Sequence, residues 1–156
     1  MRKLIGIIGM VLLLVACGTT GRQQAAKHNL ANEEKDPLSY EQRRKYDYFF
    51  LEAVRLKQKG DYDAAFELYK HCLDIYPNSG PALYDISRFY MVLGQEKKGE
   101  EALKKAVRSD ESNFWYKQTL AAYYQQKRDW PKAIAVYEDM AHQFPARLEP
   151  LMALVD

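Results

Sequence analysis

Apolar side chains recur at three- and four-residue spacings from residue 40 to residue 143, and short polar stretches interrupt them. In residues 40–59, for example, Tyr46, Phe49, Ala53 and Leu56 fall on one stripe of a helix. The same spacing predicts further helices over residues 62–76, 81–92, 96–108, 113–127 and 130–143. The pattern therefore predicts an all-α domain.

Turn signals separate these helices into pairs. Gly60 ends the first helix, and Asp61 is suited to cap the second, which Pro77 and the polar residues after it bring to an end. In the second pair we expect a core that includes Leu83, Ile86, Tyr90, Leu93, Ala102, Leu103, Ala106 and Val107. Each pair is predicted to be a helical hairpin.

The hairpins repeat with a period of 34 residues and without an insertion. The recurring positions are Gly60 and Gly94; Ala65, Gly99 and Ala133; Tyr69, Leu103 and Tyr137; and Pro77, Glu111 and Pro145. This pattern resembles the tetratricopeptide repeat. The resemblance implies antiparallel helical hairpins that stack into a right-handed superhelical array, a tetratricopeptide-repeat solenoid. Over residues 37–156, it places repeats at about 46–79, 80–113 and 114–147, with a fourth starting at 148–156.

Three residues depart from the repeat pattern. Gly99 replaces the alanine of its register and Glu111 replaces the proline, which we expect to weaken the second hairpin. Arg128 stands at the position of Gly60 and Gly94, so a left-handed backbone there would be strained unless a different turn forms.

The first 16 residues have the features of a secretion signal. Arg2 and Lys3 precede an apolar run from Leu4 to Val15, which is shorter than the roughly 20 residues of a transmembrane helix. The segment Leu14-Val15-Ala16-Cys17 that ends the run resembles the lipobox of bacterial lipoproteins. That resemblance implies lipidation, including palmitate, at Cys17; the alternative is an ordinary secretory signal with a chance cysteine.

Residues 17–36 are polar, and we interpret them as a lipidated cysteine followed by a flexible tether. The expected location is the bacterial cell envelope, with contact to the membrane through the N-terminal lipid. Gly18 follows the cysteine in place of the aspartate that retains many lipoproteins at the inner membrane. By analogy, this favours the outer membrane, facing the periplasm.

Charge argues against a nucleic-acid partner. The chain has 23 basic and 21 acidic residues, and removal of Arg2 and Lys3 leaves the two in balance. A neutral protein has no basic surplus to displace counterions from phosphates, so we predict no nucleic-acid binding.

The sequence contains no convincing catalytic or metal-binding motif. His28, His71 and His142 lie in different segments, without partners at metal-ligand spacing. Asp61 and Asp63 alternate as in a calcium loop, but the later ligands and the glycine of that loop are missing. We therefore predict no enzyme activity, no metal and no cofactor.

In the stacked array that the resemblance implies, the first helix of each hairpin lines a concave groove. Family members often bind an extended peptide or a partner helix there. Residues whose register points to this groove are Phe50, Val54, Lys57, Tyr84, Arg88, Met91, Trp115, Gln118 and Gln125. For Phe50, Val54 and Trp115, the alternative is that they fill the junctions of the hairpins. The lysine, asparagine and arginine of the carboxylate clamp found in chaperone-binding members are missing, which argues against that mode.

The C-terminal end begins a fourth repeat with Leu148, Leu151, Met152, Leu154 and Val155. This apolar helix either covers the third hairpin or belongs to a longer array, and the second interpretation is favoured because terminal repeats normally have a polar outer face.

These features predict a membrane-anchored lipoprotein whose repeat array is a scaffold for a protein or peptide partner in a cell-envelope complex. The alternatives are a homo-oligomer that acts as a structural subunit, or the N-terminal part of a longer protein with its activity in another domain.

Overall fold

The computed structural model describes residues 37–154. The predicted signal, the lipidation site Cys17 and the tether lie outside the described residues, as does Val155. Tyr40–Asp156 form a compact unit of their own, distinct from Met1–Ser39, and the description below concerns this unit.

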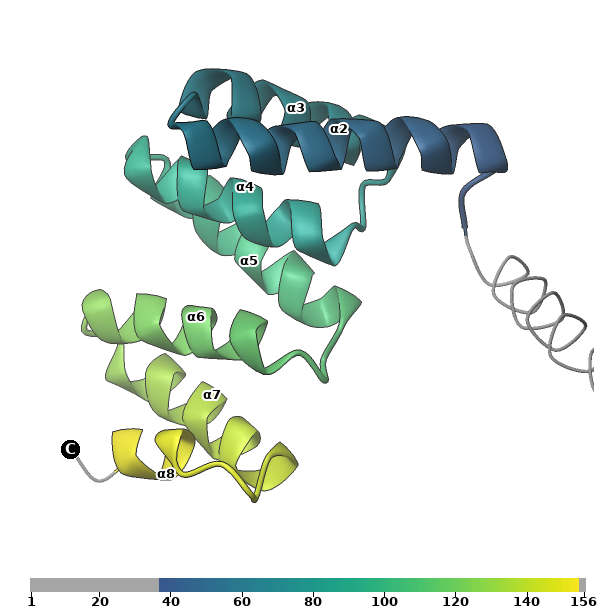
Figure 1. Cartoon of the computed structure of the whole chain (residues 1–156). Coiled ribbons are helices and arrows are strands. Elements are labelled where there is room, and N and C mark those ends of the chain that lie inside the picture. Colours follow the sequence, from purple (N-terminus) through teal and green to yellow (C-terminus); the bar gives the residue numbers. More distant parts are fainter. Residues whose placement is uncertain (1–36, 155–156) are drawn as a thin grey trace, which may run out of the picture. The chain divides into compact units, whose positions relative to one another are not determined.

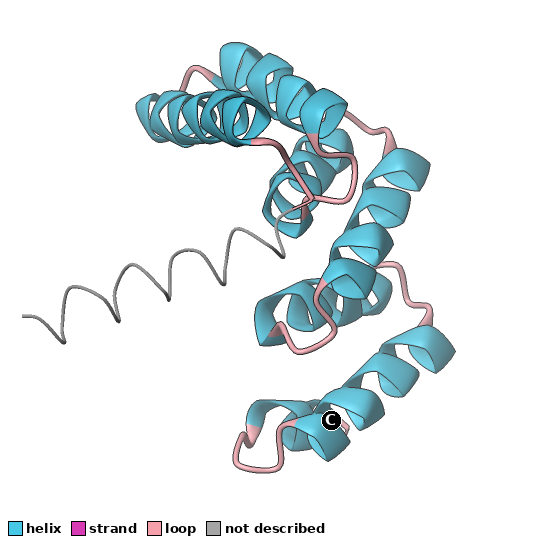
Figure 2. Cartoon of the chain, turned by 90° about the vertical axis from the view of Figure 1, so that its right-hand side faces the viewer, coloured by secondary structure: helices cyan, strands magenta, loops and turns pink. Residues whose placement is uncertain are grey.

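The described part of the unit is entirely helical, with short connecting loops (Figure 2). Its helices are α2 (Tyr40–Lys59), α3 (Tyr62–Ile75), α4 (Gly80–Val92), α5 (Glu96–Ser109), α6 (Phe114–Gln126), α7 (Trp130–Gln143) and α8 (Glu149–Ala153). α2 packs with α3, α4 with α5, and α6 with α7 as antiparallel hairpins, and each hairpin packs on the next (Figure 1). The predicted fold class is confirmed. None of the described helices is both long and apolar enough to span a membrane.

Side-chain caps fix the starts of α3, α4, α6 and α7. Asp61 accepts a hydrogen bond from the Ala64 amide at 3.4 Å, so it is a helix cap as expected. Ser79, Asn113 and Asp129 cap α4, α6 and α7 in the same way. Each cap satisfies an amide that the first turn of a helix leaves without a partner.

The turn inside each hairpin needs one residue with a left-handed backbone. Gly60 has φ of 84° and Gly94 has φ of 70°. Arg128 has the same left-handed geometry, with φ of 57°. The third hairpin thus keeps the turn of the first two, at the cost of strain at a residue that is not glycine. In the third hairpin, the Asp129 amide then donates to the Tyr124 carbonyl at 2.9 Å, which closes the end of α6.

Small residues allow the two helices of a hairpin to approach each other. Ala53 and Ala65 are fully buried in the first hairpin, and Ala121 and Ala133 occupy the same registers in the third. In the second hairpin, a Cβ on Gly99 would lie 2.9 Å from Met91 Cγ and 3.0 Å from the Ser87 carbonyl oxygen. The absence of a side chain at Gly99 therefore lets α4 and α5 approach closely, which was not predicted from the sequence.

Aromatic rings fill the junction between the first and second hairpins. Phe66 of α3 contacts Tyr90 and Phe89 of α4, with ring centroids 5.4 and 5.8 Å apart. Tyr69 also contacts Phe89, at 5.8 Å. Ring contacts of this kind stabilise a core beyond the area that they bury.

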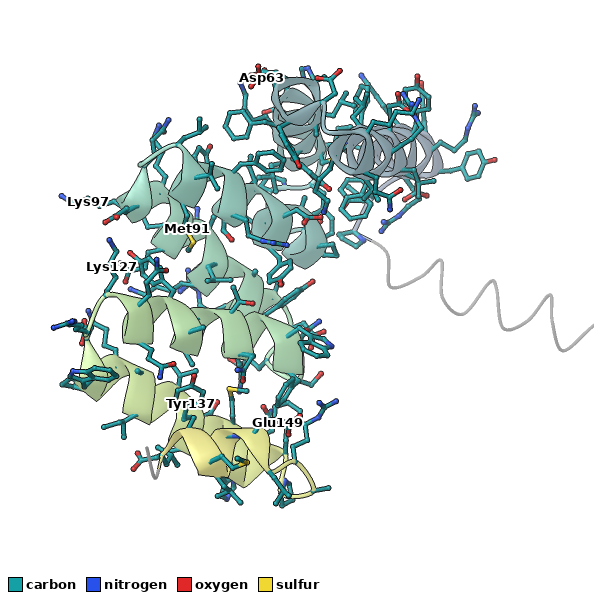
Figure 3. All side chains as sticks on the ribbon, turned by 60° about the vertical axis from the view of Figure 1, so that its left-hand side comes forward. Asp63, Met91, Lys97, Lys127, Tyr137 and Glu149 are labelled. Atoms are coloured by element: carbon teal, nitrogen blue, oxygen red, sulfur yellow. The ribbon has the colours of Figure 1, made fainter. Side chains whose placement is uncertain are left out.

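The junction between the second and third hairpins is more polar. The Tyr124 hydroxyl donates to Glu100 of α5 at 3.1 Å. Near the end of α6, Lys127 pairs with Glu96 at the start of α5 (Figure 3). Long-range polar contacts at this junction therefore accompany the stacking of the Tyr84 ring of α4 on Tyr116 of α6.

Two details of the core differ from the expectation. Leu93 was predicted to be buried, but it is 54% exposed, because α4 ends at Val92 and the helical periodicity does not continue to Leu93. Lys117 is only 5% exposed although it is charged. Its ammonium group pairs with Asp139 and donates to Gln143 Oε1 at 2.7 Å, which offsets the cost of burial.

The short helix α8 packs on α7. Pro150 is buried, and Ala153 and Leu154 pack against the core around Leu103, Tyr124 and Met140. Leu148 and Met152 are exposed, as is Leu151. α8 therefore covers part of the third hairpin and leaves apolar residues at its surface.

The strained turn at Arg128 can be tested by substitution. Arg128→Gly should stabilise the protein by about 1 kcal/mol, because glycine adopts a positive φ without a steric cost. Gly94→Ala should destabilise it by a similar amount, since a Cβ there meets no atom within 4 Å and only the backbone conformation is affected. Urea unfolding followed by circular dichroism would measure both changes. A loss of stability in Arg128→Gly would contradict the assignment.

Candidate functional site

The nine predicted groove residues all lie on the first helices of the hairpins. α2 carries Phe50, Val54 and Lys57; α4 carries Tyr84, Arg88 and Met91; and α6 carries Trp115, Gln118 and Gln125. α2, α4 and α6 follow one another along the array (Figure 1). We call the side of these helices that bears the nine residues the first-helix face.

A charged contact joins this face between the first two hairpins. The Lys57 ammonium of α2 lies 2.6 Å from Asp85 Oδ1 of α4, and the Tyr69 hydroxyl donates to Asp85 Oδ2 at 2.8 Å. Asp85 is only 9% exposed. Both of its carboxylate oxygens thus have a donor, as a buried carboxylate requires.

The Tyr69 hydroxyl is a fixed donor in this contact. Burial and the adjacent Asp85 charge raise the pKa of Tyr69 well above its usual range, so the phenol stays protonated. The Lys57 ammonium also lies 5.7 Å from the centre of the Tyr69 ring. These three side chains hold α2, α3 and α4 together.

A second contact joins the face between α4 and α6. Thr119 donates its hydroxyl hydrogen to the Trp115 carbonyl at 2.9 Å, so the Tyr84 hydroxyl donates to Thr119 Oγ1 at 3.2 Å. The Tyr84 ring stacks on Tyr116 with centroids 5.1 Å apart. Burial raises the pKa of Tyr116 to about 12, so this ring is neutral at physiological pH. The first-helix face is therefore linked from α2 to α6.

Several of the predicted residues pack inside a hairpin. Phe50 is half-buried and contacts the rings of Tyr46 and Tyr69, at 5.8 and 5.9 Å. Met91 lies against Gly99 of α5 (Figure 3). Val54 is also half-buried. Their contacts support the hairpins and leave only part of each side chain for a partner.

The third hairpin places its own predicted residues differently. Gln125 is exposed and accepts a hydrogen bond from the Tyr137 hydroxyl at 3.2 Å. Gln118 is half-buried, and its Oε1 has no hydrogen-bond partner among the described residues.

Arg88 and Trp115 are the members of the face that are most available to a partner. Arg88 is exposed and forms no ion pair within residues 37–154. Trp115 is 62% exposed, with edge contact to Phe114 at 5.4 Å. The Arg147 guanidinium lies 5.8 Å from the Trp115 ring. Exposed tryptophan and arginine are the side chains most enriched at protein interfaces.

Histidine, cysteine and acidic side chains are the other candidates for chemistry in the described part of the chain. No group of three histidine, cysteine or acidic side chains there could hold a metal ion. Cys72 is fully buried, and burial raises the pKa of its thiol to about 12, so it is a packing residue. A shallow pocket lined by Asn78, Lys105, Arg108 and Ser109 includes none of the predicted groove residues.

The hydrogen bonds that Asp85 and Thr119 form between hairpins were not predicted from the sequence. Both occupy one register of the repeat, together with Leu51. The 34-residue period places Asp85 at a register of the first helices and Lys57 on the first helix of the preceding hairpin. This pair of opposite charges is the signal from which the contact could have been predicted. The hydrogen bonds themselves depend on the angle between hairpins, which the sequence does not specify.

A family model described as tetratricopeptide repeat matches residues 56–123. A sequence search of curated proteins found no match. Repeats of this type are generally interaction modules without catalytic activity of their own.

Solved structures with a similar fold include the following three. The crystal structure of MamA protein is 22% identical with a TM-score of 0.61, over 70% of this chain and 60% of that one. A mutant O-GlcNAc transferase of Thermobaculum terrenum is 16% identical with a TM-score of 0.62, over 75% of this chain and 22% of that one. A chain of the Naa15/Naa10 complex bound to HypK-THB is 21% identical with a TM-score of 0.59, over 85% of this chain and 18% of that one.

This chain thus spans between about a fifth and three fifths of the chains that it resembles. At such identities, the similarity shows the fold. Together with the family match, the fold supports a scaffold for protein–protein interaction.

Proposed function

We propose that this protein is a bacterial lipoprotein, anchored by lipid on Cys17, whose repeat array binds a protein or peptide partner in a cell-envelope complex. The lipobox-like segment Leu14-Val15-Ala16-Cys17 supports the anchor. A thiol is the nucleophile that lipidation needs, and several acyl chains together give a stable attachment to the membrane. The absence of aspartate after Cys17 supports the periplasmic side of the outer membrane.

The observation that carries the binding function is the exposure of Arg88 and Trp115 on a face that other side chains hold in place. The Lys57–Asp85 and Tyr84–Thr119 contacts hold α2, α4 and α6 in place. These helices therefore lose little conformational entropy when a partner binds. Arg88 fits an acidic group of the partner, and Trp115 fits an apolar or cationic one. The role is that of a scaffold and not of an enzyme.

Removal of Arg88 and Trp115 should abolish capture of the partner. We expect crosslinking in native membranes, followed by purification and mass spectrometry, to recover a specific protein with the unsubstituted chain and not with Arg88→Ala/Trp115→Ala. Tyr84 is left intact because its contacts with Thr119 and Tyr116 are structural. Circular dichroism would verify that the variant folds.

The matched control is Arg108→Ala/Trp130→Ala. It removes the same residue types from α5 and α7, where Arg108 is exposed and Trp130 is 51% exposed. The control should retain the partner. Loss of the partner from both variants, or from neither, would contradict a site on the first-helix face.

The anchor can be tested separately. Cys17→Ser should release the protein from the membrane fraction and remove the mass of the acyl chains from its N-terminal peptide. Gly18→Ser is the control, because it keeps the cysteine and should leave lipidation intact. An N-terminal peptide with unmodified Cys17 in the unsubstituted protein would overturn the lipoprotein assignment and leave the binding proposal standing.

A further inference from the structure

Among residues 37–154, the side of α2 that faces away from α3 has no neighbour of the kind that covers the equivalent sides of α4 and α6. One register of the repeat contains Tyr48, Ala82 and Tyr116. Ala82 is fully buried and Tyr116 is 8% exposed, because the preceding hairpin covers them, whereas Tyr48 is 67% exposed. At the next register Asp85 is 9% exposed, whereas Leu51 is 68% exposed.

These residues belong to one exposed stripe. Tyr40, Arg44, Tyr48, Leu51 and Arg55 follow one another at spacings of four, four, three and four residues along α2. Tyr40 is 76% exposed. We call this stripe the outer face of α2. Tyrosine, leucine and arginine together are typical of an interface and not of a terminal repeat, whose outer face is normally polar.

We propose that the outer face of α2 binds the outer face of α2 in a second copy of this chain, with the two helices antiparallel and Tyr48 at the two-fold axis. A closed pair that uses the same patch on both subunits is the commonest form of homo-oligomer. The Tyr48 rings of the two copies then lie against each other, and Leu51 of each stripe lies beside Arg44 of the other.

The charges of α2 favour this orientation. Reflection about Tyr48 places Arg44 opposite Glu52 of the second copy, four residues on either side of the axis. It also places Glu41 opposite Arg55, seven residues on either side. Within one chain Arg55 already donates to Glu52 at 2.7 Å, so Arg44 and Glu41 of the second copy would extend this ion pair at its two ends. Parallel helices in register would instead place each charge opposite a like charge, which is unfavourable.

Beyond α7, the described residues leave no open position for the α2 of a second copy to pack in a head-to-tail contact. Pro150 of α8 follows Tyr116 by one period of 34 residues, and both are buried. α8 therefore already occupies the place on α7 where the first helix of another hairpin would pack. A second copy would have to displace α8 before its α2 could stack there.

The proposed interface leaves the first-helix face accessible. Phe50 and Lys57 lie on the opposite side of α2 from Tyr48, and Val54 adjoins the outer face only at Leu51, three residues before it. A dimer would therefore present two copies of the proposed binding face, and this inference does not depend on the identity of the partner.

A cysteine at the axis tests the contact. In full-length chains that carry Cys17→Ser and are kept in mild detergent, Tyr48→Cys should form a disulfide-linked dimer about tenfold faster than Tyr62→Cys. Tyr62 is a matched control because it is 60% exposed on α3, outside the outer face. Cys72 is buried and does not compete. Equal rates, or no linked dimer from Tyr48→Cys, would overturn the proposal.

Charge exchange tests the orientation. By sedimentation equilibrium, the unsubstituted chain should dimerise, and Arg44→Glu should raise the dissociation constant about tenfold. Arg44→Glu/Glu52→Arg should restore part of the lost dimerisation, because the exchanged charges again face each other, although Glu52→Arg also removes the ion pair with Arg55. A monomer at all concentrations would overturn the proposal, and a double variant as weak as the single one would exclude the antiparallel pairing.

Discussion

The fold depends on one constraint: a single helical hairpin has two apolar sides and can bury only one of them by itself. The other side must pack on the next hairpin, so the junctions between hairpins determine the arrangement of every helix. Phe66, Phe89 and Tyr90 form the first junction through ring contacts. The second junction relies on tyrosine packing and on contacts of Glu96 and Glu100. Both solutions keep the same period in spite of their different chemistry.

The same junctions prepare the surface that we propose for binding. Asp85 and Thr119 occupy equivalent positions, and each receives a hydrogen bond from a tyrosine in the preceding hairpin. Neighbouring hairpins are thereby joined on the side where Arg88 and Trp115 are exposed. A preformed face binds with a smaller loss of conformational entropy than one that must order itself.

Local rules were sufficient to predict much of this architecture from sequence. The turn at Arg128 follows the register of Gly60 and Gly94, because the short connection between the helices requires a left-handed residue whatever its type. The burial of Lys117, the packing of Gly99 against Met91 and the exposure of Leu93 were not predicted. They depend on how closely two helices approach and on where a helix ends, and hydrophobic spacing does not report either quantity. For the candidate site, the period predicted which helices carry the groove residues. It did not predict which of these side chains, such as Phe50 and Met91, would pack inside a hairpin.

The central claim is that polar contacts across the junctions hold the first helices in one arrangement, and a double-mutant cycle on Lys57 and Asp85 tests it most directly. The free energy of unfolding would be measured in urea for Lys57→Met, Asp85→Asn and the double variant, beside the unsubstituted chain. We predict a coupling energy of about 1–3 kcal/mol, since Asp85 is buried and the two groups are in direct contact. A coupling indistinguishable from zero would mean that the two hairpins are held by ring packing alone, and would contradict the account.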